Sequence, residues 1–277
     1  MNWKRAVRKI PVYLLVLLVL VVQVYPIFWV IMSSFKTNDS MIQNPPYSFP
    51  KEFTFDNYMQ LADSLFGKYF TNTIIVAIFT LIGIVVLGAL AAYPLSKMDF
   101  KGRKLIRNIF MLGMMVPVFV SLIPMFRVYN TLGLRNTHLS LILPQIGFAI
   151  PMAMYLCIGF LEYVPNSLIE SGYIDGAGTF RIFFQIVLPL MRNTLVTIAT
   201  FNFVFVWNEY IFANTFISDA EMKTIPLGLN DFVGQYGQVD WGGSFAAISA
   251  TILPTLVVFF ILNKQVMNGM TAGAIKA

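Results

Sequence analysis

Long stretches without a charged residue constrain this 277-residue chain more than any other feature. Five of them are 10–35, 70–96, 108–126, 139–161 and 241–263, and a sixth, 193–218, is apolar except for Glu209. A helix needs about 20 apolar residues to cross hydrocarbon. Backbone N–H and C=O groups in lipid must form hydrogen bonds within the chain, so such segments are expected to be helical. The sequence therefore predicts an all-α polytopic membrane protein in which residues 1–277 form one transmembrane domain. The predicted spans cover about 10–35, 70–96, 106–127, 139–161, 193–218 and 242–263.

The basic residues give the expected orientation of these spans. The first apolar stretch is about twice as long as the 7–15-residue core of a signal peptide and has no small-residue cleavage site, so it is expected to remain as a span. If the N-terminus is cytoplasmic, 13 of the 19 lysines and arginines lie on the inner side. We therefore expect both termini to face the cytoplasm of a bacterial or archaeal cell. The formal net charge of +6 follows from this topology and does not indicate nucleic acid.

The chain lacks the residues on which most catalytic and metal sites depend. Cys157 is the only cysteine, so neither an intramolecular disulfide nor a cysteine-based metal site can form. His138 is the only histidine, and no G-x-x-x-x-G-K-[ST] phosphate-binding loop is present. We expect no catalytic residue, cofactor or metal on this chain, and any nucleotide chemistry must take place on another polypeptide.

Two polar segments lie on the predicted exterior side. Residues 36–67 contain several prolines and predict an ordered, turn-rich cap with a short helix from about Asp56. Residues 219–240 predict a loop with one short helix. On the cytoplasmic side, the loop 97–104 is short and basic.

The cytoplasmic connection 162–192 is too long for a turn and is not of low complexity. Its first part predicts a helix that starts near Pro165, carries a capping box formed by Ser167 and Glu170, and stops near Gly176. A second helix is predicted from about residue 179, with an apolar stripe at helical spacing: Phe180, Phe183, Phe184 and Val187. This stripe has to pack against the bilayer surface, the protein's own helices or a soluble partner.

The same connection carries a spacing that resembles a known motif. The cytoplasmic signature loop of ABC-importer membrane subunits is written E-A-A-x₃-G-x₉-I-x-L-P. Five anchors match it in register: Glu170, Gly176, Ile186, Leu188 and Pro189. Ser171 and Gly172 replace the two alanines, and the glycine should loosen the helix by about 1 kcal/mol. The position of the motif before the fifth predicted span also resembles that family.

The resemblance extends over nearly the whole chain and fits the sugar-importer branch best. The similar segments are 25–29, 33–36, 53–58, 207–209, 223–229, 236–237 and 241–242. The tail at 267–276 resembles the G-[LM]-T-x-G-A-[VI]-K ending of the six-span second permease subunit. The resemblance implies a permease subunit of a sugar or oligosaccharide importer, embedded in membrane lipid. An ABC importer for another small solute and a self-contained secondary transporter are the alternatives, the latter disfavoured because no internal repeat is evident.

The resemblance also implies partners and a docking site. Such a chain pairs with a second permease subunit, two ATPase subunits that hold ATP and Mg²⁺, and an exterior solute-binding protein. The 162–192 connection would supply a coupling helix that docks on an ATPase. The implied docking residues are Leu168, Ile169, Glu170, Tyr173, Asp175, Gly176 and Ala177. The alternative is local: Glu170 could cap its own helix and Asp175 the next one.

A possible substrate pathway is suggested by polar and aromatic residues inside the spans. An ionisable group in the membrane, such as Glu209, usually faces a pathway or a partner. Sugars are recognised by amides, carboxylates and aromatic faces. The candidate pathway residues are Gln145, Asn202, Trp207, Asn208, Glu209 and Tyr210. The alternative is that these side chains join helices by interhelical hydrogen bonds, or that Glu209 forms a pair at the exterior end.

Overall fold

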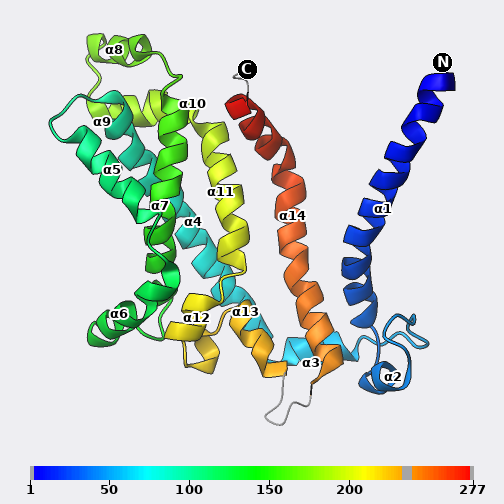
Figure 1. Ribbon diagram of the computed structural model, residues 1–277. Helices are drawn as coiled ribbons and strands as arrows, with labels where there is room; N and C mark the ends of the chain where they lie inside the picture. The colour runs from blue at the N-terminus through cyan, green and yellow to red at the C-terminus, as the bar shows by residue number, and fades with distance from the viewer. Residues whose placement is uncertain (1–2, 233–238, 275–277) are drawn as a thin grey trace. The chain divides into compact units, whose positions relative to one another are not determined.

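The computed structural model describes residues 3–232 and 239–274, with side chains described for 9–232 and 239–261. The described residues form helices joined by loops and contain no strand, which confirms the all-α prediction. The segments similar to sugar importers at 236–237 and 275–276 lie outside the described residues. Four helices are long and apolar enough to cross a membrane alone (Figure 1): α1 (Trp3–Ser33), α4 (Phe66–Lys97), α7 (Leu139–Leu161) and α14 (Trp241–Ala274).

Two further apolar segments are bent pairs of helices. Helices α5 (Arg103–Gly113) and α6 (Val118–Thr131) meet at 97°. The break ends at Pro117, which cannot donate a helical hydrogen bond and disfavours helical geometry at the preceding residue. The second pair, bent by 72°, joins 179–190 to α11 (Arg192–Trp207). The structure thus has four single-helix candidates for spans, or up to six if each bent pair counts as one span. The second pair does not coincide with the predicted fifth span, which begins at residue 193.

Two of the predicted spans are not single straight helices. The third, 106–127, covers parts of both α5 and α6. The fifth, 193–218, contains most of α11, a break at 208–210 and the short helix α12 (Ile211–Phe216). Hydropathy does not reveal the first break, because the apolar residues Met114–Val116 continue through it. The second break coincides with the polar residues Asn208 and Glu209, which interrupt an otherwise apolar segment.

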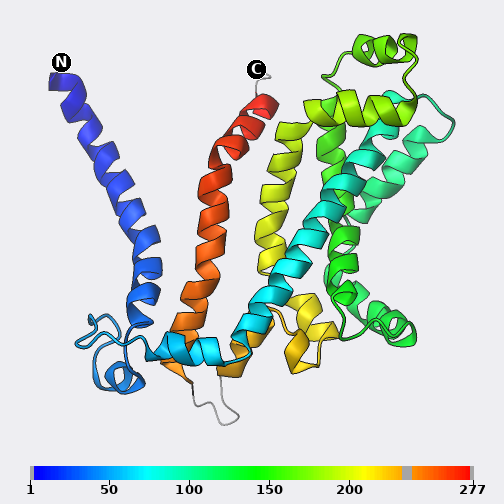
Figure 2. The same ribbon diagram turned by 180° about the vertical axis from the view of Figure 1, so that it is seen from behind.

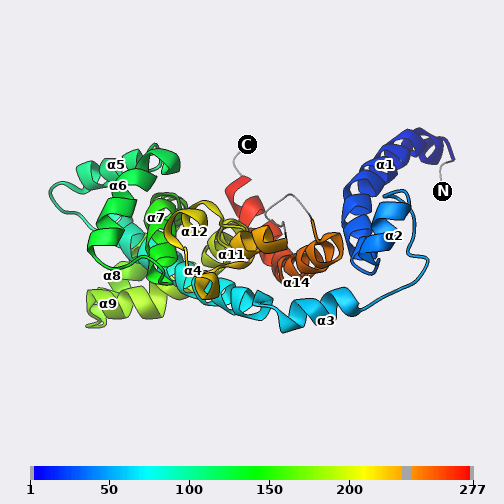
Figure 3. The same cartoon turned by 90° about the horizontal axis from the view of Figure 1, so that it is seen from below.

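The chain forms two compact units by its internal contacts: Met1–Gly67 with Gly228–Leu253, and Lys68–Leu227 with Pro254–Ala277. In the second unit, α7 packs against α5 and against α11, and it lies between them when the helices are viewed end-on (Figure 3). Helix α8 (Asn166–Ile174) and α9 (Thr179–Ile182) lie at one end of this unit, and α6 and α12 at the other (Figures 1 and 2). The helices of the segment 162–192 therefore lie at the opposite end of this unit from α6 and α12.

The loop 219–240 contains more helical turns than the single short helix predicted. They are the 3₁₀ turn η2 (Ala220–Met222), α13 (Ile225–Gly228) and the 3₁₀ turn η3 (Leu229–Phe232). Part of this loop is fixed to the first turns of α4, since Asn72 donates to the carbonyls of Glu221 and Lys223 at 2.8 and 3.0 Å. The Nε2 atom of His138 lies 2.9 Å from Asn72 Oδ1, so the only histidine has a structural partner.

In the first unit, α2 (Asn38–Gln43) and α3 (Asp56–Asp63) form the predicted polar cap, and α3 begins at the predicted residue. Asn57 holds this cap to the end of α1. Its buried amide donates to the carbonyls of Ser34 and Lys36, both at 2.8 Å. The hydroxyls of Tyr58 and Ser34 are 2.7 Å apart. The sequence segments 33–36 and 53–58 are thus parts of one hydrogen-bonded structure.

Candidate functional site

The first candidate site is the helical projection formed by residues 162–192. Helix α8 begins directly after Pro165, whose φ of −61° suits a helix start, and no side chain caps this end. The predicted capping box is therefore wrong, because Ser167 already lies inside the first turn. The proline starts the helix too early for Ser167 to occupy the capping position.

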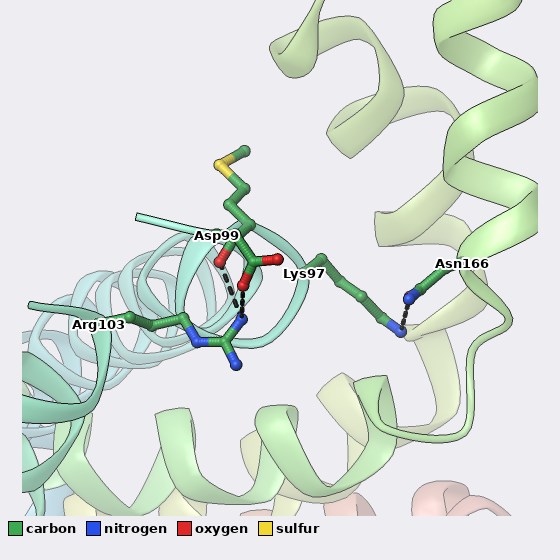
Figure 4. A network of polar contacts seen from close by, with 5 residues as sticks. Lys97, Asp99, Arg103 and Asn166 are labelled. Carbon is green, nitrogen blue, oxygen red and sulfur yellow. Dashed lines mark hydrogen bonds and ion pairs between the residues drawn. The ribbon is translucent and has the colours of Figure 1, made fainter. Parts of the chain in front are cut away.

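Lys97, at the last residue of α4, takes the place of a cap in fixing the start of α8. Its Nζ donates to the Val164 carbonyl at 2.6 Å. It also donates to Asn166 Oδ1 at 2.9 Å (Figure 4). Nearby, Arg103 bonds Asp99 at 3.0 Å in the same loop (Figure 4). From the sequence, Lys97 counts only among the basic residues that set the orientation of the spans. Its position at the C-terminus of a helix, where a cation interacts favourably with the helix dipole, could have indicated a structural role from the sequence.

The turn after α8 forms as predicted at Asp175 and Gly176. Gly176 has φ +78°, its N–H donates to the Tyr173 carbonyl at 3.0 Å, and the next N–H, of Ala177, reaches the Gly172 carbonyl at 2.9 Å. These two bonds constitute a Schellman ending, which requires a left-handed residue. The glycine of the motif is therefore explained by backbone geometry.

The second small residue of the motif is explained by packing inside the projection. A methyl group at Gly172 would come within 3.1 Å of Ile182 and of Ile186. Ile186 lies in the π-helical turn η1 (Phe183–Val187), which continues into α10 (Leu188–Leu190). Gly172 thus faces the second helix of the projection, and the isoleucine anchor of the motif packs against it. The small residue at this position is therefore accounted for by packing within the projection.

The proposed docking residues divide into exposed and buried ones. Ile169 is only 6% exposed and packs within the chain, so it cannot offer a contact surface. Leu168, Glu170, Tyr173, Asp175 and Gly176 are exposed, and Ala177 is half-buried. One exposed apolar residue, Ile174, was missed and is 86% exposed. Phe180, which was predicted only as part of the apolar stripe, is 74% exposed.

The carboxylates of Glu170 and Asp175 cap neither α8 nor α9. Over residues 9–232 and 239–261, the side-chain carboxylates of Glu170 and Asp175 have no hydrogen-bond or ion-pair partner. The N-terminus of α9 also has no side-chain cap. The alternative in which both acids serve only as helix caps therefore has no support in these contacts.

Replacing Gly176 tests the turn directly. An L-residue in the left-handed region costs about 1–2 kcal/mol, whereas asparagine tolerates it better. We expect Gly176→Val to reduce the amount of ATPase that co-purifies with the chain by about 5- to 30-fold, and Gly176→Asn to preserve most of it. Equal loss with valine and asparagine would contradict a conformational role for Gly176.

The second candidate site is a pocket of about 540 Å³ in the second unit. Five of the six predicted pathway residues line it: Gln145, Asn202, Asn208, Glu209 and Tyr210. Trp207 does not line it; its indole is buried beside Phe70 and Phe203, with ring centroids 5.8 and 5.4 Å away. The aromatic wall comes instead from residues that were not predicted: Phe148, Phe205 and Phe212.

The pocket presents hydrogen-bond acceptors. Gln145, Asn202 and Asn208 each donate their side-chain amide to the carbonyl four residues earlier in their own helix, at 2.8–2.9 Å. Their amide oxygens have no partner among the residues that the structure describes. Glu209 accepts the backbone N–H groups of Phe212 and Ala213 at 2.6 and 3.1 Å, and so holds the start of α12. The side-chain hydrogen bonds of Gln145, Asn202, Asn208 and Glu209 therefore reach residues at most four positions away in the chain.

Comparison with known proteins places these features in context. Residues 84–270 match the family described as binding-protein-dependent transport system inner membrane component. The diacetylchitobiose uptake system permease protein of Streptomyces coelicolor is 34% identical over 92% of this chain and 85% of its own length. The galactooligosaccharides transport system permease protein of Bacillus subtilis is 35% identical over 100% of this chain and 98% of its own.

One solved structure shows a similar fold. It is a bacterial ABC transporter involved in import of the acidic polysaccharide alginate, with a TM-score of 0.80. The alignment covers 95% of this chain and 98% of that one, at 21% identity. At this identity, the likeness concerns the arrangement of helices.

Proposed function

Because this chain belongs to the family of binding-protein-dependent transport system inner membrane components, we propose that it is a permease subunit of an ATP-driven oligosaccharide importer. It supplies half of the translocation pathway, and a second permease subunit supplies the other half. ATP and Mg²⁺ bind to two separate ATPase subunits on the cytoplasmic side. An exterior solute-binding protein delivers the substrate, and both termini of this chain face the cytoplasm.

The observation that carries the ATPase-driven role is the surface of the 162–192 projection. It combines unpartnered carboxylates at Glu170 and Asp175 with exposed apolar side chains at Ile174 and Phe180. Exposed apolar groups beside free charges are typical of a protein interface rather than of lipid-facing surface. The Lys97 anchor and the Gly176 turn fix the shape of the projection, so it can transmit ATPase movement as a rigid element.

The carbohydrate class is supported by the names of the similar permeases and by the pocket of the second unit. Sugar hydroxyls are donors, and the amide oxygens of Gln145, Asn202 and Asn208 are acceptors at its wall. Phenylalanine rings complete the wall and can cover the apolar face of a sugar ring. Glu209 contributes by holding α12 in place rather than as a free carboxylate.

Alanine substitution at Gln145, Asn202 and Asn208 tests this pathway. Each hydrogen bond is worth about 0.5–1.5 kcal/mol, or about 2- to 10-fold in affinity, so the triple variant should raise the KM for oligosaccharide uptake at least about 10-fold. The matched control is Thr197→Ala, which removes another bond to a carbonyl four residues earlier on α11, outside this pocket. Unchanged uptake and unchanged preference among sugars in the triple variant would remove the pathway assignment.

A further inference from the structure

A different pocket, of about 320 Å³, lies within the unit formed by Met1–Gly67 and Gly228–Leu253. It is lined by Trp29, Ser33, Lys36, Met41, Ile42, Pro46, Trp241 and Phe245. Its walls are apolar or aromatic, and its side-chain polar groups are the Ser33 hydroxyl, the Lys36 amino group and the two indole N–H groups. It belongs to the cap that follows the first predicted span, on the predicted exterior side.

Lys36 is the unusual member of this pocket, because it is only 2% exposed and has no acidic partner. In the described part of the chain, no carboxylate lies within ion-pair distance of its Nζ atom, and its recorded bond is to the Pro46 carbonyl at 3.1 Å. Lysine is almost never fully buried unless it is paired. Burial accordingly lowers the pKa of this amino group. The buried Ser33 hydroxyl beside it also has no hydrogen-bond partner.

The walls of the pocket are held in place before any ligand arrives. The Trp29 indole N–H donates to the same Pro46 carbonyl at 2.7 Å, which fixes the loop over the pocket. The Trp29 and Phe245 rings meet edge to face at 5.1 Å. On either side of the lining residue Trp241 in the chain, Asn38 donates to Asp240 Oδ1 at 2.9 Å and accepts the Gly242 N–H at 2.9 Å. The pocket is therefore a preformed apolar slot with an unpaired cation at one side.

We propose that this pocket receives an acidic side chain of the exterior solute-binding protein. The carboxylate pairs with the Lys36 amino group and accepts the Ser33 hydroxyl, while its methylene groups lie against Trp241 and Ile42. This inference rests on the proposed function, in which such a protein delivers the substrate, and it adds a contact site and its chemistry. A buried charge pair of this kind adds specificity and slows dissociation.

The composition of the walls favours an acidic side chain over a sugar. A sugar ring carries several hydroxyls, and each would lose hydration without a partner against Met41, Ile42 and Phe245. A glutamate or aspartate has apolar carbons for these walls and a single charged end for Lys36. The pocket volume is at the lower limit of small-molecule sites, which also suits one side chain.

The test uses the complete importer in lipid nanodiscs and the solute-binding protein that stimulates the ATPase of the wild-type importer. Lys36→Met keeps the side-chain volume and removes the charge. It should weaken binding of that protein at least about 10-fold. It should also make this affinity less dependent on the NaCl concentration between about 50 and 300 mM. Ile42→Trp, at a 76% exposed position of the mouth, should weaken binding by blocking entry. The matched control is Tyr47→Trp, 73% exposed and outside the lining, which should bind as wild type.

The partner carboxylate is then found by double-mutant cycles. One Asp→Asn or Glu→Gln change in the binding protein should weaken binding to the wild-type importer but not to the Lys36→Met importer. Wild-type affinity in both Lys36→Met and Ile42→Trp overturns the proposal. The proposal is also overturned if the variants bind the solute-binding protein normally and instead lose association with the second permease subunit, bound anionic lipid or free maltotriose. Uptake of labelled oligosaccharide by the wild-type importer is measured separately. A wrong substrate class would appear in that uptake, whereas a wrong docking site would appear only in the binding of the solute-binding protein.

Discussion

Glu170→Arg is expected to abolish oligosaccharide uptake while the chain still inserts into the membrane. The Glu170 side chain is exposed and has no partner in the described part of the chain, so the substitution breaks no internal contact. If this carboxylate meets a complementary group on an ATPase, reversing its charge places like charges together in a desolvated interface, which costs several kcal/mol. The loss should therefore appear in assembly and transport rather than in folding.

The measurement is the amount of ATPase that co-purifies with the tagged permease, together with uptake of labelled oligosaccharide in cells. Co-purified ATPase should fall at least about 10-fold. Asp63→Arg provides the matched control, because it makes the same charge change at an exposed residue of α3 whose carboxylate has no partner among the residues that the structure describes. Normal uptake in the Glu170→Arg variant would refute the docking role, whereas loss of membrane-inserted protein would refute its surface position.

A sequence can predict the 162–192 projection well where its structure is decided locally. The end of α8 depends on one left-handed residue, and Gly176 is the residue type that takes that conformation without strain. The start of α8 near Pro165 was also predicted correctly, because the proline suits the first turn of a helix. The capping box of Ser167 and Glu170 was wrong, because Ser167 lies inside the first turn and no side chain caps this end.

Contacts between distant segments are where sequence reasoning failed. Ile169 lies at a helical position that could face either a partner or the chain itself, and only the position of the second helix buries it. Lys97 reaches across to Val164 and Asn166, residues that spacing alone does not connect. The pocket of the second unit was predicted better, since Gln145, Asn202, Asn208, Glu209 and Tyr210 are polar residues inside apolar spans. Trp207 has an aromatic ring that serves packing equally well, and it does so here.

The segments similar to sugar importers in the first unit acquire a physical explanation only in three dimensions. Residues 33–36, 53–58 and 241–242 are distant in sequence, yet they converge on the side chain of Asn57. Each segment restricts the others through this contact. Gly242 cannot accept a larger side chain without a shift, because Asn57 lies against it and is held by two hydrogen bonds.

Gly242→Ala is accordingly expected to destabilise the exterior cap strongly. An added methyl group would overlap Asn57 Oδ1. Asn57 cannot turn away without giving up its bonds to Ser34 and Lys36, and each buried carbonyl left unpaired costs about 1–3 kcal/mol. The alternative, a shift at the start of α14, would break the bond between Gly242 N–H and Asn38.

The thermal unfolding midpoint of the purified importer in detergent should fall by about 5 °C or more in the Gly242→Ala variant. The matched control is Gly67→Ala in the first turn of α4, where a methyl group meets nothing within 4 Å. Alanine is the better helix former, so that control should keep or slightly raise the midpoint. Asn57→Ala removes the overlap, so the double variant Gly242→Ala with Asn57→Ala should be no less stable than Asn57→Ala alone. Additive losses in the double variant would show that the two residues act separately and that the cap is not organised around Asn57.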